Sequence, residues 1–184
     1  MKKMNWVLLF FTTTVFMVSC DSGGKNKTEE KITEIKATST SAEATASFQQ
    51  GLLSLDLGEV QKARVAFSKA IEQDPKFGWA YLMRANTAPS TKEFADDITK
   101  GKANSDSAEN WQKWYADYLS TNLAGNRDKG LEILQQIAEA YPRAARAQVD
   151  LGNGYAGNNQ FNKARECYHN AITLDPKWVG GMRH

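Results

Sequence analysis

The chain has 184 residues, of which 41% are hydrophobic and 24% are charged, a composition typical of globular proteins. Its 23 Lys and Arg residues exceed its 21 Asp and Glu residues by two, and Lys2 and Lys3 account for that excess. The remainder of the chain is electrically balanced, which argues against a protein that binds nucleic acid through its charge.

The N-terminal segment has the layout of a secretory signal peptide. A short basic start is followed by an apolar stretch at residues 6–18 and then by Ser19 and Cys20. These about 13 residues are fewer than the ~20 that span a bilayer. The order Met17-Val18-Ser19-Cys20 resembles the lipoprotein box of bacterial lipoproteins, in which the cysteine becomes the first mature residue and carries acyl chains such as palmitate.

This resemblance implies a signal peptide at residues 1–19 and a lipid on Cys20, with the folded part held outside the cytoplasm on an inner or outer envelope membrane. The alternative is an ordinary secretory signal with a chance cysteine. If Cys20 is acylated, Cys167 has no partner in its own chain and a disulfide framework is excluded.

The next segment, residues 20–43, is rich in Lys, Glu, Ser, Thr and Ala. Ile32 and Ile35 are its only sizeable apolar side chains, so it buries too little surface to offset the entropy lost on ordering. We therefore expect a disordered linker with a root-mean-square reach of roughly 25–30 Å.

An internal repeat dominates the rest of the sequence. Residues 61–77 recur at 162–178, where Lys, Ala, Arg, Ala, Ile, Asp, Pro and Lys reappear at matching positions. A third copy lies between them, because Gly130, Leu134, Ile137 and Pro142 stand 34 positions before Ala164, Tyr168, Ala171 and Pro176. A period of this length predicts stacked supersecondary units, each of which buries its apolar face against its neighbours.

The repeat resembles the tetratricopeptide repeat, a helix–turn–helix unit of 34 residues. In the last copy Leu151-Gly152, Tyr155, Phe161, Ala164, Tyr168, Ala171 and Pro176 match the family's positions in order. Small residues let the two helices approach, aromatic residues fill the space between them, and proline ends the second helix. The expected repeat core comprises Ala63, Phe67, Ala70, Pro75, Leu134, Pro142, Gly152, Tyr155, Ala164, Tyr168, Ala171 and Pro176.

The resemblance implies an all-α, right-handed α-solenoid of three to four hairpins at 44–77, 78–110, 111–144 and 145–178. The second copy is degenerate. Its second helix, expected at about 91–103 after a turn and cap at Pro89-Ser90-Thr91, has only Phe94 and Ile98 as strong apolar anchors. Residues 179–184 form the start of a would-be fifth repeat. We expect either a truncated relative of a longer protein or another molecule that covers this end.

Catalytic, cofactor and metal sites are not expected. Gly152, Gly154 and Gly157 match the dinucleotide pattern G-x-G-x-x-G, but that fingerprint requires a preceding strand where this sequence reads as helix. His169 lacks a metal-ligand spacing with Cys167, and we expect a solvated histidine beside a partly buried thiol. We therefore predict a protein that is not an enzyme.

Two groups of residues are candidates for binding another protein. Trp111, Trp114, Tyr115 and Tyr118 recur at helical spacing and either pack between hairpins or face a partner. In the tetratricopeptide family the first helices line a concave groove. Carried over by position, this groove comprises Phe48, Leu52, Leu82, Asn86, Tyr115, Leu119, Asn122, Arg146, Val149 and Asn153.

Asn86 and Asn153 occupy the position that some relatives use to hold a peptide backbone or terminal carboxylate. The lysines of that carboxylate clamp are missing, and each Asn could equally be a solvated helix residue. The resulting hypothesis is a membrane-anchored adaptor for an unknown protein or peptide partner, with no nucleic acid bound. The alternative is a structural envelope protein that self-associates through the C-terminal hairpin.

Overall fold

The structure is a computed structural model that describes residues 39–105 and 110–177. The predicted signal peptide, Cys20, most of the predicted linker and the C-terminal stub lie outside these ranges. All regular secondary structure in the described residues is helical. The helices are α1 (Ala42–Asp56), α2 (Val60–Gln73), α3 (Gly78–Ala85), α4 (Thr91–Ala103), α5 (Asn110–Leu123), α6 (Arg127–Ala140), α7 (Ala145–Gly157) and α8 (Phe161–Leu174).

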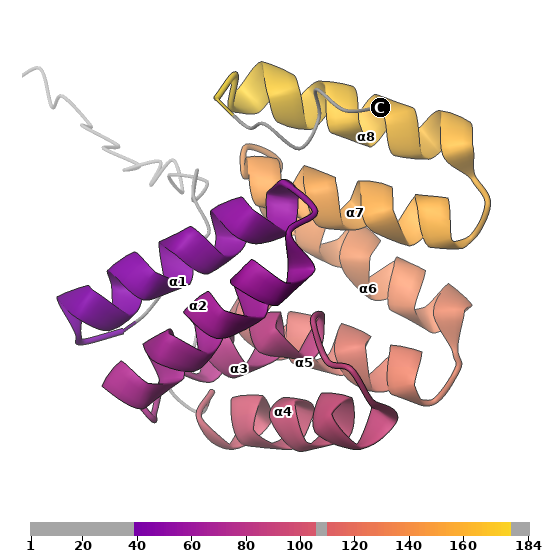
Figure 1. The fold of residues 1–184 in the computed structure, drawn as a ribbon. Coiled ribbons are helices and arrows are strands. Elements are labelled where there is room, and N and C mark those ends of the chain that lie inside the picture. Colours follow the sequence, from indigo (N-terminus) through magenta and orange to yellow (C-terminus); the bar gives the residue numbers. More distant parts are fainter. Residues whose placement is uncertain (1–38, 106–109, 178–184) are drawn as a thin grey trace, which may run out of the picture.

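The helices form four hairpins, α1/α2, α3/α4, α5/α6 and α7/α8, which follow one another in chain order (Figure 1). Each hairpin packs against the next, so the predicted all-α helical repeat solenoid is confirmed. Within the described residues no helix is both long and apolar enough to cross a bilayer.

The same local chemistry ends the corresponding helices. Pro75, Pro142 and Pro176 each stand two residues after the last residue of α2, α6 and α8. A proline there cannot continue the helix, because it lacks the amide hydrogen and its ring clashes with the preceding turn. Of these three residues of the expected repeat core, Pro75 and Pro176 are exposed and Pro142 is half-buried. They end helices and do not fill the apolar core.

The turns inside three hairpins share a left-handed residue two positions before the second helix. These are Gly58 with φ 73°, Gly125 with φ 75° and Asn159 with φ 59°. Glycine and asparagine tolerate this conformation better than other residues. In the second hairpin a serine cap replaces this turn: the Ser90 hydroxyl accepts a hydrogen bond of 3.2 Å from the backbone N–H of Glu93.

Close helix contact inside the first and last hairpins depends on glycine. A Cβ at Gly51 would lie 2.4 Å from the Phe67 ring, and one at Gly152 would lie 2.6 Å from the Tyr168 ring. Phe67 is fully buried and Tyr168 is half-buried. Other predicted core residues, Ala63, Ala70, Leu134, Ala164 and Ala171, are buried, whereas Tyr155 is half-buried.

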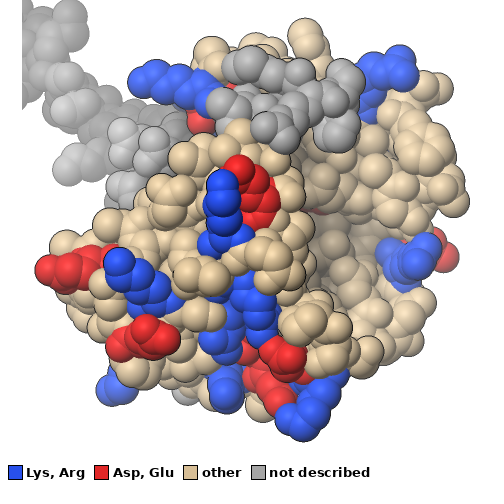
Figure 2. All heavy atoms as spheres, in the orientation of Figure 1, with Lys and Arg blue, Asp and Glu red and all other residues tan. Residues whose placement is uncertain are grey.

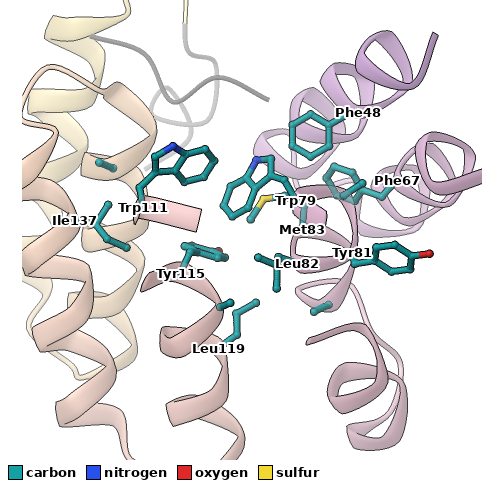
Figure 3. Packing of buried hydrophobic residues seen from close by; sticks show 14 of the residues in the cluster. Phe48, Phe67, Trp79, Tyr81, Leu82, Met83, Trp111, Tyr115, Leu119 and Ile137 are labelled. Atoms are coloured by element: carbon teal, nitrogen blue, oxygen red, sulfur yellow. The ribbon is translucent and has the colours of Figure 1, made fainter. Parts of the chain in front are cut away.

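Aromatic side chains join the first three hairpins. Phe48 of α1 packs on Phe77, with ring centroids 4.9 Å apart. Trp79 of α3 meets Trp111 edge-on at 4.4 Å and Tyr115 at 4.8 Å (Figure 3). Trp111 and Tyr115 are buried, which agrees with core packing between hairpins. Phe161 was expected to fill the space between the helices of the last hairpin. It does not, because as the first residue of α8 it is 62% exposed.

The degenerate second hairpin is held by a buried ion pair. The Arg84 guanidinium donates from Nε to Asp97 Oδ2 at 2.9 Å and from Nη2 to Asp97 Oδ1 at 2.6 Å. The Asp97 side chain is only 4% exposed. Ile98 is buried and Phe94 half-buried, so this polar link between α3 and α4 supplements a small apolar contact.

Candidate functional site

A cavity of about 390 Å³ lies where the first helices of the hairpins converge. We call it the central cavity. Its walls come from the end of α1 and the following turn, from α3, α5 and α7, and from one residue of α8. In Figure 2 the molecular surface is hollowed beside the α1–α2 corner. The lining residues are Leu55, Asp56, Leu57, Gly58, Met83, Asn86, Tyr115, Tyr118, Arg146, Val149, Asp150, Asn153 and Tyr168.

An ion pair between the first and last hairpins forms part of the cavity wall. Arg146 of α7 donates from Nη2 to Asp56 Oδ2 of α1 at 2.7 Å. The two side chains are 18% and 11% exposed. Burial acts to lower the pKa of the Arg146 guanidinium, but the charges of Asp150 and Asp56 outweigh it and raise that pKa. Arg146 therefore stays charged.

Asp150 stands one helical turn after Arg146 on α7 and lines the same cavity. Burial raises the pKa of its carboxyl to about 7, an effect that Arg146 opposes and Asp56 reinforces. The Asp150 side chain makes no hydrogen bond to any residue that the structure describes. At neutral pH this carboxyl consequently exists as a mixture of its protonated and ionised forms.

Amides and phenols complete the polar lining. Asn86 donates from Nδ2 to Tyr115 Oη at 3.1 Å and to the Leu82 carbonyl at 3.3 Å, and the Tyr168 hydroxyl donates to Asn153 Oδ1 at 2.9 Å. Burial is the main cause that raises the pKa of Tyr115, Tyr118 and Tyr168. These phenols are neutral at physiological pH, so the charges of the cavity come from Asp56, Arg146 and Asp150.

The structure brings half of the predicted groove residues to the central cavity, namely Asn86, Tyr115, Arg146, Val149 and Asn153. Asn122 lies in a neighbouring cavity of about 330 Å³, which Asn153 also lines. Leu52 is half-buried and packs against the core.

The central cavity is not lined by Phe48, Leu82 and Leu119, which the sequence assigned to the groove. Each is 1% exposed or less and packs between hairpins, as Figure 3 shows, so a partner cannot reach them. The physical reason is the close approach of the hairpins. Leu82, for example, fills the space above Gly101, where a Cβ would lie 2.5 Å from it.

Sequence reasoning missed the two carboxylates of the cavity. Asp150 carried a recognisable signal, because it follows Arg146 by four residues and so shares a helix face with a residue already assigned to the groove. No sequence pattern pointed to Asp56, since it lies 90 residues from its partner Arg146.

The other candidate chemical groups have structural explanations. Gly152 and Gly154 lie inside α7 and pack on Tyr168 and Leu134, and no strand precedes them in the described residues. Cys167 is buried, and burial raises the pKa of its thiol, whereas His169 is exposed. Across residues 39–105 and 110–177 no group of three or more His, Cys, Asp or Glu side chains is placed to hold a metal ion.

Two models of the tetratricopeptide repeat family match the chain, one at residues 44–77 and one at residues 145–178. The chain is a tetratricopeptide repeat protein. These matches cover the first and last hairpins, which contain the cavity's ion pair. A protein of this class is a protein-interaction scaffold, and the hairpins of this tetratricopeptide repeat protein line the central cavity.

Solved structures give further likenesses. The MamA RS-1 ArsTM double mutant is 18% identical, with 74% of this chain and 78% of that chain covered and a TM-score of 0.38. A crystal structure of YrrB, described as a TPR protein with an unusual peptide-binding site, is 19% identical, with 76% and 90% covered and a TM-score of 0.34. No curated protein matches this tetratricopeptide repeat protein.

Proposed function

We propose that this protein is a non-catalytic adaptor of the bacterial cell envelope, anchored to a membrane by lipid on Cys20, and that its central cavity holds a segment of another protein. The observation that carries the proposal is the cavity itself, which all four hairpins line. Its volume lies near the lower end of the ~300–1,000 Å³ usual for ligand sites. The cavity therefore suits a few side chains of a segment.

The lining combines the two kinds of contact that a protein segment needs. Leu55, Leu57 and Val149 supply apolar wall, and burial of apolar groups against such a wall favours binding. The exposed amides of Asn86 and Asn153 can bond to a peptide backbone. The Nδ2 group of Asn153 donates no hydrogen bond to another described residue.

The sequence supports the membrane anchor. The lipoprotein-type segment ending at Cys20 precedes a polar stretch that reaches α1 at Ala42. Acyl chains on one cysteine hold a protein on a bilayer because each buried methylene contributes ~0.8 kcal/mol. The folded hairpins would then work within reach of partners at the membrane surface.

Affinity capture tests the binding proposal. The full-length chain, solubilised with its envelope in detergent, is compared with the double variant Asn86→Ala/Asn153→Ala. We expect the double variant to retain its helical circular dichroism and to recover far less of each specific partner. The matched control is Asn162→Ala/Asn170→Ala, which removes two exposed amides of α8 outside the cavity. Equal recovery by the two double variants would contradict the proposal.

Fractionation tests the anchor separately. Cys20→Ser should move the protein from the membrane fraction to the soluble fraction, because serine cannot carry the thioether-linked lipid. Mass spectrometry of the mature N-terminus should find acyl chains on Cys20 in the parent chain. A parent chain without acyl groups would contradict the anchor and would leave the binding proposal untouched.

A further inference from the structure

We propose that the central cavity selects a basic side chain, lysine or arginine, of the bound protein segment and places its cationic group beside Asp150. The inference rests on the proposed function, because it assumes that the cavity holds a protein segment. It identifies the chemistry of that segment at one anchor position.

The charge balance of the cavity supports a cation. Asp56, Arg146 and Asp150 are the charged residues among its lining, and Arg146 is already bonded to Asp56. When Asp150 is ionised, the three groups carry one net negative charge. A cation entering the cavity is attracted by that excess, whereas a peptide carboxylate or phosphate is repelled by it.

Asp150 is the group in the cavity that most needs a partner. Its side chain is half-buried, burial is the main cause that raises the pKa of its carboxyl, and it makes no hydrogen bond to another described residue. An ionised carboxylate in such a place is costly unless it is paired. A lysine ammonium or an arginine guanidinium would supply the hydrogen-bond donors that the carboxylate lacks and a second positive charge besides that of Arg146.

The rest of the lining fits a long basic side chain. Tyr115 and Tyr118 lie near enough to Asp150 that its charge raises the pKa of both phenols. Aromatic faces within about 6 Å of a cation attract it. Leu55 and Val149 provide apolar surface for the methylene stem, which lysine and arginine bury while the charged end reaches a polar group.

Binding should be coupled to the protonation of Asp150. The charged and titratable groups that line the cavity with it are Asp56 of α1, Tyr115 and Tyr118 of α5, Tyr168 of α8, and Arg146 on its own helix. None of the phenols ionises near neutral pH, and Arg146 remains charged. Since the Asp150 carboxyl has a pKa of about 7, a cation bound beside its ionised form should lose about tenfold in affinity between pH 8 and pH 6.

A random peptide library displayed on phage, selected against the full chain, tests this inference. The parent should return peptides enriched several-fold in lysine or arginine at one position. Asp150→Asn, which keeps the shape but removes the charge, should still return peptides without that enrichment, and Asp150→Glu should retain it. The control Glu166→Gln removes an exposed carboxylate of α8 outside the cavity and should behave as the parent.

The possible outcomes separate the inference from the proposed function. Peptides without basic enrichment, or equal enrichment in Asp150→Asn, would overturn the inference and leave peptide binding standing. A parent chain that returns no peptides at all would overturn both. For a selected basic peptide, fluorescence anisotropy should show the tenfold loss between pH 8 and pH 6 for the parent and a flat profile for Asp150→Asn. A flat parent profile would overturn the role of Asp150.

Discussion

Arg146 and Asp56 join the first and last hairpins of the solenoid across 90 residues of chain, through a hydrogen-bonded ion pair of 2.7 Å. In an ordinary solenoid each repeat contacts only its neighbours. Here α1 and α7 approach closely enough for direct bonding between their side chains, and both helices line the central cavity.

Arg146→Ala should destabilise the protein by about 2 kcal/mol, because it leaves the Asp56 carboxylate desolvated without its partner. Urea unfolding followed by circular dichroism measures the loss. Lys129→Ala is the control, since the Lys129–Glu132 pair is solvent-exposed and should contribute less than about 0.5 kcal/mol. Equal losses in the two variants would contradict the structural role of Arg146.

Asp150 should make the protein less stable as pH rises from about 4 to about 7. The pKa of its carboxyl is about 7 in the folded state, above the ~3.9 of an unfolded chain, so the folded state binds the extra proton in this window. Asp150→Asn should therefore gain stability relative to the parent at pH 8, by at least about 1 kcal/mol. The gain should vanish near pH 4. Chemical denaturation across this range, with Glu166→Gln expected to follow the parent, checks the sign.

Gly51→Ala should destabilise the first hairpin by about 1–3 kcal/mol, because the new Cβ would lie 2.4 Å from the buried Phe67 ring. Adding Phe67→Leu should recover part of the loss, since leucine lacks the ring that the Cβ meets. Gly157→Ala, where a Cβ meets nothing within 4 Å, should change stability by less than about 0.5 kcal/mol. Thermal unfolding of the three variants measures these differences, and a tolerated Gly51→Ala would show that the two helices separate easily.

Asp97→Ala should cost about 3 kcal/mol, because it leaves the Arg84 guanidinium without its two-point partner. The effect should be concentrated in the second hairpin, where hydrogen exchange of α3 and α4 amides should accelerate most. Asp96→Ala, one residue earlier, breaks an exposed pair with Lys92 and should have little effect on unfolding. If both substitutions cost the same, the ion pair is not what holds this hairpin.

The sequence predicted helical hairpins well where side chains repeat. The recurrence around Ala63 and Ala164 predicted the two hairpins that the family models match. The predicted cap at Ser90 gave the start of α4 correctly. Local rules suffice there, because prolines, caps and small residues act within one hairpin. The buried Arg84–Asp97 pair was not predicted, since a charged residue in a degenerate repeat looks the same whether it is solvated or buried.

The candidate site was predictable only in part. Positions inherited from the repeat brought Asn86 and Asn153 to the central cavity, but they also assigned Phe48, Leu82 and Leu119 to a surface that these residues do not reach. Which side of a first helix is accessible depends on how sharply successive hairpins turn. That angle results from many small contacts between hairpins, and no single residue in the sequence encodes it.

The contact between α1 and α7 changes how this protein should unfold. In a linear array the terminal repeats fray independently. A link across 90 residues instead couples the unfolding of one terminal hairpin to the unfolding of the other. Because closing so long a loop is slow compared with forming local hairpins, the link should form late in folding. The four hairpins should then behave as one cooperative unit whose two ends melt together.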